Sequence, residues 1–240
     1  MFFLNFFKQK TNNMNNVELA SQLFETQTLG GDIEPRYKYK VNTILKQCTP
    51  KGDKYPERQQ VLLKVIELIG EPNTPKERFM VAKAYAWSRA NYRQQAIKYL
   101  ELYLNNDLYS EIMRTYSANN SYQEGLKRHL SEMYGYLGKA YIGECNFDKA
   151  LSVYEYMIGK FPDDPPAYMG KCEVLTKQNR LQECHDWLVS CKKLPCYKFN
   201  KKYAETDNEN WFYFTINRLL NDTGEKIRKN YTYKPRKSKI

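Results

Sequence analysis

The stretch YGYLGKAYIGECNFDKALSVYEYMIGKFP, residues 134–162, decides the fold of this chain. On both sides of the short turn ECNF at 144–147, its apolar residues recur at the three- and four-residue spacing of one helix face. Small residues on both helices would let the two backbones approach closely, large ones would fill the space around that contact, and a proline would break the second helix. The stretch therefore predicts a helical hairpin. The residues that carry the pattern are Tyr134, Leu137, Gly138, Tyr141, Ala150, Tyr154 and Pro162.

These intervals resemble the tetratricopeptide repeat (TPR), a 34-residue helical hairpin with the pattern W-x2-L-G-x2-Y, then A-x3-F, then P. With residue 131 at the first position, the pattern residues fall at repeat positions 4, 7, 8, 11, 20, 24 and 32. Further copies are identified at 165–198 and 77–110, where small residues again stand at positions 8 and 20. Position 7 departs from the pattern in both copies, because it is Lys171 in one and Lys83 in the other. The resemblance implies an all-α fold, a right-handed α-solenoid of TPR-like hairpins.

The segments around the repeats are interpreted from composition and periodicity. The insertion at 111–130 predicts either an extra helix at 109–117 or an elongated first helix that begins near residue 120. No segment alternates apolar and polar residues with a period of two over a useful length, so no sheet is expected. The predicted order is an apolar and flexible N-terminal segment at 1–16, degenerate helical hairpins at 17–76, TPR-like repeats at 77–198 (77–110, 131–164 and 165–198), a capping helix at 199–221 and a basic flexible tail at 222–240.

The charge balance favours acidic partners. The net charge is +11 and the isoelectric point is about 9.2, which suits nucleic acid, an anionic membrane surface or an acidic protein. The same balance is also compatible with plain solubility. The segment 222–240 holds seven Lys or Arg against two acidic residues, which accounts for +5 of the net charge of +11. The basic character is therefore not confined to this tail.

The cysteines and the N-terminus point to a reducing, cytoplasmic location. Six cysteines occur without the charged start and long apolar region of a secretory signal. No window approaches the ~20 apolar residues of a membrane-spanning helix. The phenylalanine-rich residues 2–7 could still make weak contact with a membrane surface or a partner, or they could form a turn against the first helices.

No motif for catalysis or cofactor binding occurs in the sequence. The two histidines, His129 and His185, belong to no recognisable catalytic or metal motif, and no glycine-rich phosphate loop is present. Four cysteines and His185 lie within residues 172–196, but their gaps do not match the short ligand pairs of zinc sites. Because three of these cysteines coincide with repeat positions that pack, buried packing is favoured over metal or redox chemistry. We expect no enzyme activity, cofactor, metal or small-molecule substrate.

The resemblance also implies where a ligand would lie. In this family, ligands commonly occupy the concave groove lined by the first helix of each repeat. An ordinary solvated groove is the alternative. The carboxylate clamp of the chaperone-binding members is absent here, because Val81, Tyr85, Tyr136, Pro166 and Gly170 stand at its positions. The implied groove residues are Arg78, Tyr85 and Arg89 in the first copy, Glu132, Tyr136 and Lys139 in the second, and Met169, Glu173 and Lys177 in the third.

Three classes of function remain open, and the sequence favours them in the following order. The leading hypothesis is a protein–protein interaction scaffold whose groove holds a protein or peptide segment, with its aromatic and basic groups suited to an acidic one. The alternative is a nucleic-acid-associated or regulatory protein that uses the basic surface and the C-terminal tail. An enzyme with an unfamiliar site is the third, because a fold alone does not determine function.

Overall fold

The computed structural model describes residues 16–27, 32–88, 90–105, 120–198 and 211–232. Every regular element within these ranges is a helix, and no strand occurs among them, so the expected all-α class is confirmed. None of the helices in the described ranges combines the length and apolar character needed to cross a membrane. The chain divides into two compact units, unit 1 (Met1–Ala118) and unit 2 (Asn119–Ile240), and each is described by itself.

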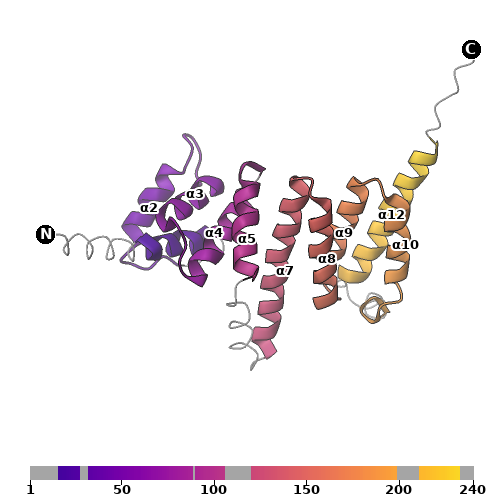
Figure 1. The fold of residues 1–240 in the computed structure, drawn as a ribbon. Helices are drawn as coiled ribbons and strands as arrows, with labels where there is room; N and C mark the ends of the chain where they lie inside the picture. The colour runs from indigo at the N-terminus through magenta and orange to yellow at the C-terminus, as the bar shows by residue number, and fades with distance from the viewer. Residues whose placement is uncertain (1–15, 28–31, 89, 106–119, 199–210, 233–240) are drawn as a thin grey trace, which may run out of the picture. The chain divides into compact units, whose positions relative to one another are not determined.

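Unit 1 consists of helices that pack on their neighbours in sequence (Figure 1). α4 packs against both α3 and α5. Buried side chains from the first four helices, among them Leu23, Val41, Leu62 and Met80, share one hydrophobic core. The elements are a helix over residues 16–27, α2 (Lys38–Gln47), α3 (Arg58–Ile69), α4 (Pro75–Trp87), the short 3-10 helix η1 (Ala90–Tyr92) and α5 (Arg93–Asn105).

The start of α4 is defined by local chemistry. The Thr74 hydroxyl accepts a hydrogen bond from the Glu77 backbone N–H, and the Glu77 carboxylate accepts one from the Thr74 backbone N–H. This capping box satisfies amide groups that have no partner inside the helix. Pro75 occupies the first helical position, where its missing N–H costs nothing.

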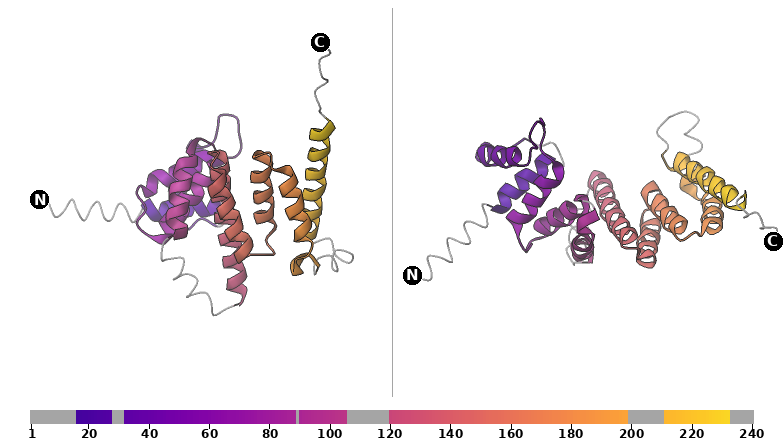
Figure 2. Two further views of the ribbon diagram at one scale, coloured as in Figure 1. Left: turned by 45° about the vertical axis from the view of Figure 1, so that its right-hand side comes forward. Right: turned by 90° about the horizontal axis from the view of Figure 1, so that it is seen from above.

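Unit 2 contains longer helices that also pack in order of sequence. α8 packs against both α7 and α9, α7 also contacts α9, and α12 packs against α9 and α10. Because short turns join α7 to α8 and α8 to α9, successive helices are antiparallel, and α7 and α9 run in the same direction (Figure 2). The elements are α7 (Asn120–Gly143), α8 (Phe147–Lys160), α9 (Pro165–Lys177), α10 (Leu181–Cys191), a helical turn over residues 195–198 and α12 (Trp211–Thr232).

The turns that end α7 and α9 have the same geometry. Cys145 and Asn179, 34 residues apart, both have a φ of 58°, which is the left-handed region. The backbone N–H that follows each of them reaches back to a carbonyl five residues earlier, at 2.9 Å in the first turn and 2.8 Å in the second. Such bonds satisfy the last carbonyls of a helix. The backbone therefore repeats at the interval that the side-chain pattern predicted.

The structure bears on two expected boundaries and corrects one of them. α7 is described from Asn120, where a helix was expected to begin, while 109–117 lies outside the described residues, so the alternative of an extra helix there stays a prediction. Residues 222–232, expected in a flexible tail, are instead part of α12. The reason is that the buried face of α12 continues past residue 221, since Thr223 is buried and Ile227 is half-buried. The segments 1–15, 199–210 and 233–240 lie outside the described residues.

Candidate functional site

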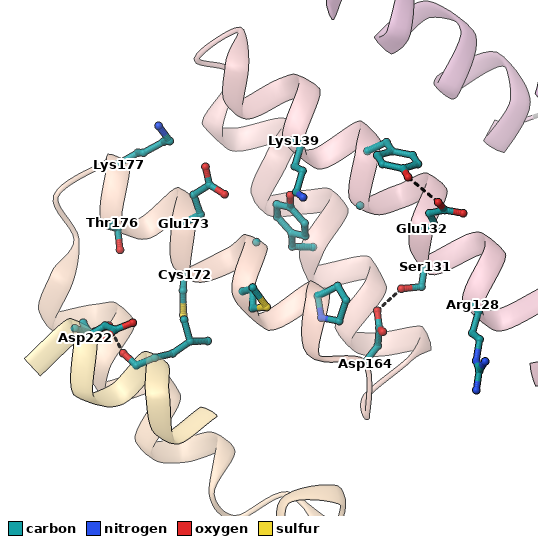
Figure 3. A pocket seen from close by; sticks show the side chains of 18 of the residues that line it. Arg128, Ser131, Glu132, Lys139, Asp164, Cys172, Glu173, Thr176, Lys177 and Asp222 are labelled. Atoms are coloured by element: carbon teal, nitrogen blue, oxygen red, sulfur yellow. Dashed lines mark hydrogen bonds between the residues drawn. The ribbon is translucent and has the colours of Figure 1, made fainter. Parts of the chain in front are cut away.

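A groove with a volume of about 860 Å³ lies within unit 2. Side chains of α7 and α9 supply most of its lining, and α12 supplies a third side. Tyr154 is the one lining residue from α8, which packs against both α7 and α9. Figure 3 shows the labelled side chains of α7, α9 and α12 gathered around this space.

The floor of the groove is the ring of Tyr154, and two glycines make room for it. A Cβ atom at Gly138 of α7 would lie 2.5 Å from Cζ of Tyr154, and one at Gly170 of α9 would lie 2.1 Å from the same atom. Both distances are far below van der Waals contact, so neither position has space for a side chain. Tyr154 therefore reaches from α8 toward the groove because both neighbouring helices carry glycine at that level.

The Tyr154 hydroxyl is buried without a hydrogen-bond partner among the described residues. The residue as a whole is only 1% exposed, yet it lines the groove. Burial raises the pKa of Tyr154, and the negative charge of Glu173 acts in the same direction. The hydroxyl consequently remains protonated at neutral pH, and it can donate a hydrogen bond to a group that enters the groove. An unsatisfied buried hydroxyl destabilises the free protein by roughly 1–3 kcal/mol.

The groove lining holds equal numbers of basic and acidic side chains, but the two kinds are unevenly distributed along it. Four basic and four acidic side chains line it. In Figure 3, Lys139, Glu173 and Lys177 lie toward one end, whereas Arg128, Glu132 and Asp164 lie toward the other. The basic members are Arg128, Lys139, Lys177 and Lys226, and the acidic members are Glu132, Asp164, Glu173 and Asp222.

Asp164 holds the start of α9 against α7. The sequence predicted an acidic N-cap for α9 at Asp163-Asp164, and Asp164 is the N-cap residue. Its side chain makes no bond to the first turn of α9 but accepts a hydrogen bond from the Ser131 hydroxyl of α7. Burial raises the pKa of Asp164, although the Ser131 hydroxyl acts in the opposite direction. Beside it, Lys127 and Asp163 form an ion pair of 2.7 Å.

Six of the side chains that the repeat register assigned to a groove do line this one. Tyr136 and Lys139 come from α7, and Glu173 and Lys177 come from α9. Glu132 and Met169 join them, and the Tyr136 hydroxyl donates to Glu132 at 2.6 Å. The structure thus brings these residues together, while their role in binding a partner stays a prediction.

The residues assigned in the first copy belong to unit 1. The Nη1 atom of Arg78 donates to the backbone oxygen of Asn73 at 2.9 Å. The ring of Tyr85 stacks on that of Tyr99 at 5.5 Å between centroids, and burial raises the pKa of Tyr85. Arg89 lies outside the described residues.

Sequence reasoning missed two parts of the groove. Tyr154 was interpreted as packing only, and the sequence signal for its second role is the pair of glycines that flank it in space. The other omission is the contribution of α12, through Leu219, Asp222, Thr223 and Lys226. The helix had been expected to end at residue 221, so the side chains beyond that point were assigned to a tail.

The cysteines of unit 2 lie mostly in its interior. Cys172, Cys184 and Cys191 are buried, and Cys172 also lines the groove. A hydrogen bond with Cys184 and burial both raise the pKa of Cys172. Within the described residues, no three or more His, Cys, Asp or Glu side chains gather as metal ligands would.

The chain was also compared with known proteins. Neither the protein-family models, nor the curated proteins, nor the solved structures contain a match to it.

Proposed function

We propose that the chain is a non-catalytic interaction scaffold built on TPR-like repeats, and that the groove of unit 2 binds a segment of a partner protein. The repeat assignment is supported by the two turns that share one geometry 34 residues apart. It is also supported by the burial of the small residues at repeat positions 8 and 20, namely Gly138, Ala150, Cys172 and Cys184. In this proposal α12 continues the solenoid as its capping helix.

One observation carries the proposed function: six positions that the register assigned to ligand contact lie on a single groove. The register was derived from the packing positions of the repeat, which are different residues. The groove volume of about 860 Å³ is within the range of well-formed ligand sites. Tyr136, Met169 and Leu219 in the lining offer apolar surface, and the charged lining residues offer specificity.

The structure changes the expected chemistry of the partner. The aromatic and basic groups assigned to the groove suggest an acidic peptide, but the lining holds equal numbers of acidic and basic side chains. The net charge of +11 therefore does not arise there. A segment with charges of both signs suits this lining better than a uniformly acidic one.

The test is affinity capture of partners from native extract by the full chain, with and without nuclease, followed by mass spectrometry. The expected result is a defined set of proteins that survives nuclease and is lost with Tyr136→Ala. Tyr156→Ala is the control, because Tyr156 lies on α8 outside the groove lining and is 39% exposed, so the same change there leaves the groove intact. Equal recovery with both variants would contradict the groove assignment.

A second candidate function is association with single-stranded nucleic acid, and a surface of unit 1 favours it. Tyr39 of α2 is 84% exposed, and Tyr55 of the α2–α3 connection is 80% exposed. Five exposed lysines surround them in sequence, and none forms an ion pair within the described residues: Lys38, Lys40, Lys46, Lys51 and Lys54. Bare aromatic rings among lysines are suited to base stacking and phosphate contact. We propose this surface, rather than the tail, as the nucleic-acid site in that alternative.

This alternative is tested by fluorescence anisotropy with a labelled 20-nucleotide oligothymidine. Binding should weaken with salt, with a slope near −0.7 for each phosphate neutralised. The Tyr39→Ala/Tyr55→Ala double variant should bind at least about fivefold more weakly, since stacking contributes to each base contact. Binding that is unchanged in this variant would leave only non-specific attraction and would remove the candidate.

A further inference from the structure

We infer that the groove of unit 2 binds its peptide in one orientation only. An acidic residue of the peptide docks at one end of the groove and a basic residue docks at the other. Between them, the Tyr154 hydroxyl donates a hydrogen bond to a main-chain carbonyl of the peptide. The inference rests on the proposed function, because it specifies the segment that the groove would hold. It goes beyond that function by stating a polarity and by assigning a binding role to a buried residue.

The polarity follows from the directions of the helices. Since α7 and α9 run in the same direction, their first turns lie at one end of the groove and their last turns at the other. α12 runs the same way, because Arg218 lies 3.9 Å from Met169 of α9, whereas Thr223 contacts Cys184, which in turn contacts Cys172 later in α9. Residues late in α7, α9 and α12 therefore share one end.

The two ends carry opposite net charge. Arg128, Glu132 and Asp164 line the end at which α9 begins, so that end has one basic and two acidic side chains. The end at which α9 finishes has three basic and two acidic side chains, from Lys139, Lys177, Lys226, Glu173 and Asp222. A basic group complements the first end, and an acidic group complements the second.

Asp164 supports the docking of a basic peptide residue at the end where α9 begins. It is partly buried, and its pKa is raised mainly by that burial, so its charge is only partly compensated in the free protein. The Ser131 hydroxyl and the charge of Lys127 compensate this carboxylate, and Lys127 itself pairs with Asp163. A cationic side chain of the peptide would supply the missing opposite charge.

Tyr154 defines the centre of the floor. Its hydroxyl is the buried donor of the lining that has no partner within the described residues. An extended peptide presents a main-chain carbonyl at regular intervals, whereas a carboxylate at this point would be repelled by Glu173, whose charge already acts on Tyr154. The neutral carbonyl is therefore the acceptor that fits this position.

The distance between the two ends gives the spacing of the peptide charges. From Arg128 to Lys139 the axis of α7 rises about 17 Å, at the usual rise for each helical residue. An extended chain covers about 3.3 Å for each residue. The acidic and basic residues of the peptide should therefore stand about five positions apart.

The experiment starts with a random nine-residue peptide library displayed on phage and selected on the full chain. The peptide that is most enriched is synthesised with a fluorescent label, together with a version in which its acidic and basic residues are exchanged. Anisotropy titrations then use the wild type and three variants: Tyr154→Phe, Lys139→Glu/Lys177→Glu and the control Lys192→Glu/Lys193→Glu. The control changes the net charge equally at two exposed residues outside the groove. Thermal unfolding is recorded for every variant.

The expected result is a selected peptide whose charge order is fixed and whose exchanged version binds at least about tenfold more weakly. Lys139→Glu/Lys177→Glu should lose at least tenfold in affinity, whereas the control should lose less than about threefold. Tyr154→Phe should lose about three- to tenfold, as for one hydrogen bond, while its melting temperature stays the same or rises. A purely structural Tyr154 would change melting without changing affinity.

Two failures can be told apart. If the selected peptides depend on Lys139/Lys177 but bind equally with their charges exchanged, or bind Tyr154→Phe unchanged, the inference is overturned and the groove function stands. If no peptide is enriched, or binding ignores every groove variant, the proposed function itself is wrong. Asp164 and Lys177 also complement the dipole of α9, so changing them alters stability as well as binding. The inference is therefore tested by peptide affinity and by the order of the peptide charges, not by protein stability.

Discussion

At the scale of single residues, Tyr154 packs between two glycines of the neighbouring helices and also forms part of the groove lining. The Tyr154 ring of α8 fills the level at which Gly138 and Gly170 lack side chains. A methyl group at either glycine would overlap the ring, which is only 1% exposed, so the ring or a helix would have to shift. Core overpacking of this kind costs about 1–3 kcal/mol.

We therefore predict that Gly138→Ala and Gly170→Ala each lower the free energy of unfolding by at least about 1 kcal/mol. Gly135→Ala is the control, because it lies on the same helix as Gly138 with nothing within 4 Å of the added atom. That change should stabilise by up to about 1 kcal/mol, since alanine favours a helix interior over glycine. Urea denaturation followed by circular dichroism measures all three. A Gly138→Ala variant as stable as Gly135→Ala would refute the packing argument.

The two lysines that depart from the repeat pattern are accommodated by tryptophan. The Nζ atom of Lys83 lies 4.6 Å from the centroid of Trp87, and that of Lys171 lies 4.8 Å from the centroid of Trp187. Lys171 also pairs with Glu155 at 2.8 Å. A long aliphatic stem can cover apolar surface while its ammonium group rests on an aromatic face. The departures at position 7 are therefore consistent with helix packing.

At the scale of elements, the turns at Cys145 and Asn179 decide how one helix leads into the next. Both residues occupy the left-handed region, where a Cβ atom is unfavourable. Asparagine tolerates this conformation better than cysteine, because its short polar side chain can form local hydrogen bonds. Cysteine at 145 therefore leaves more strain in the α7–α8 turn than asparagine leaves in the α9–α10 turn.

We predict that Cys145→Gly raises the free energy of unfolding by about 0.5–1 kcal/mol, because glycine adopts a positive φ without steric cost. Cys145→Val should lower it, since a branched side chain is disfavoured there. Cys145 is exposed, so neither change disturbs the core. The change in stability is measured as the shift in the denaturant concentration at the midpoint of unfolding, with the slope of the free energy against denaturant concentration unchanged. If Gly and Val variants rank in the same order at an ordinary exposed helix position, the left-handed turn is not the cause of the difference in stability.

At the scale of the whole molecule, both units bury tyrosines whose ionisation would oppose folding. Burial raises the pKa of Tyr103 to about 12, and it also raises the pKa of Tyr85 in unit 1. In unit 2, burial raises the pKa of Tyr154 and of Tyr168. The unfolded chain releases these protons near pH 10, which is below the pKa values of the folded state.

Because the folded state holds these protons more tightly, their contribution to stability is complete below about pH 10 and is lost as the pH rises through 12. We predict a fall in melting temperature between pH 9.5 and pH 11.5, measured by circular dichroism. In a Tyr103→Phe variant the fall should be smaller, since one of these groups no longer titrates. A melting temperature that stays constant across this range would contradict the burial of the tyrosines.

Much of the fold could be derived from local sequence, because helical spacing and turn residues act over short distances. The hairpin at 134–162 and the turn at 144–147 follow from periodicity, whereas the long helix from Asn120 was one of two alternatives that the pattern left open. The end of α12 could not be derived in the same way. Its last turns look polar in sequence, and the buried Thr223 shows that contacts with distant residues extend the helix.

The sequence by itself determined the helical class, the repeat interval and the positions of α7 and α9 that face a groove. These depend on spacing along the chain, which is visible in one dimension. Only the tertiary structure decided that Tyr154 passes between Gly138 and Gly170, that α12 lines the groove and that its two ends differ in charge. Those features depend on which side chains meet in space, and residues far apart in sequence supply them.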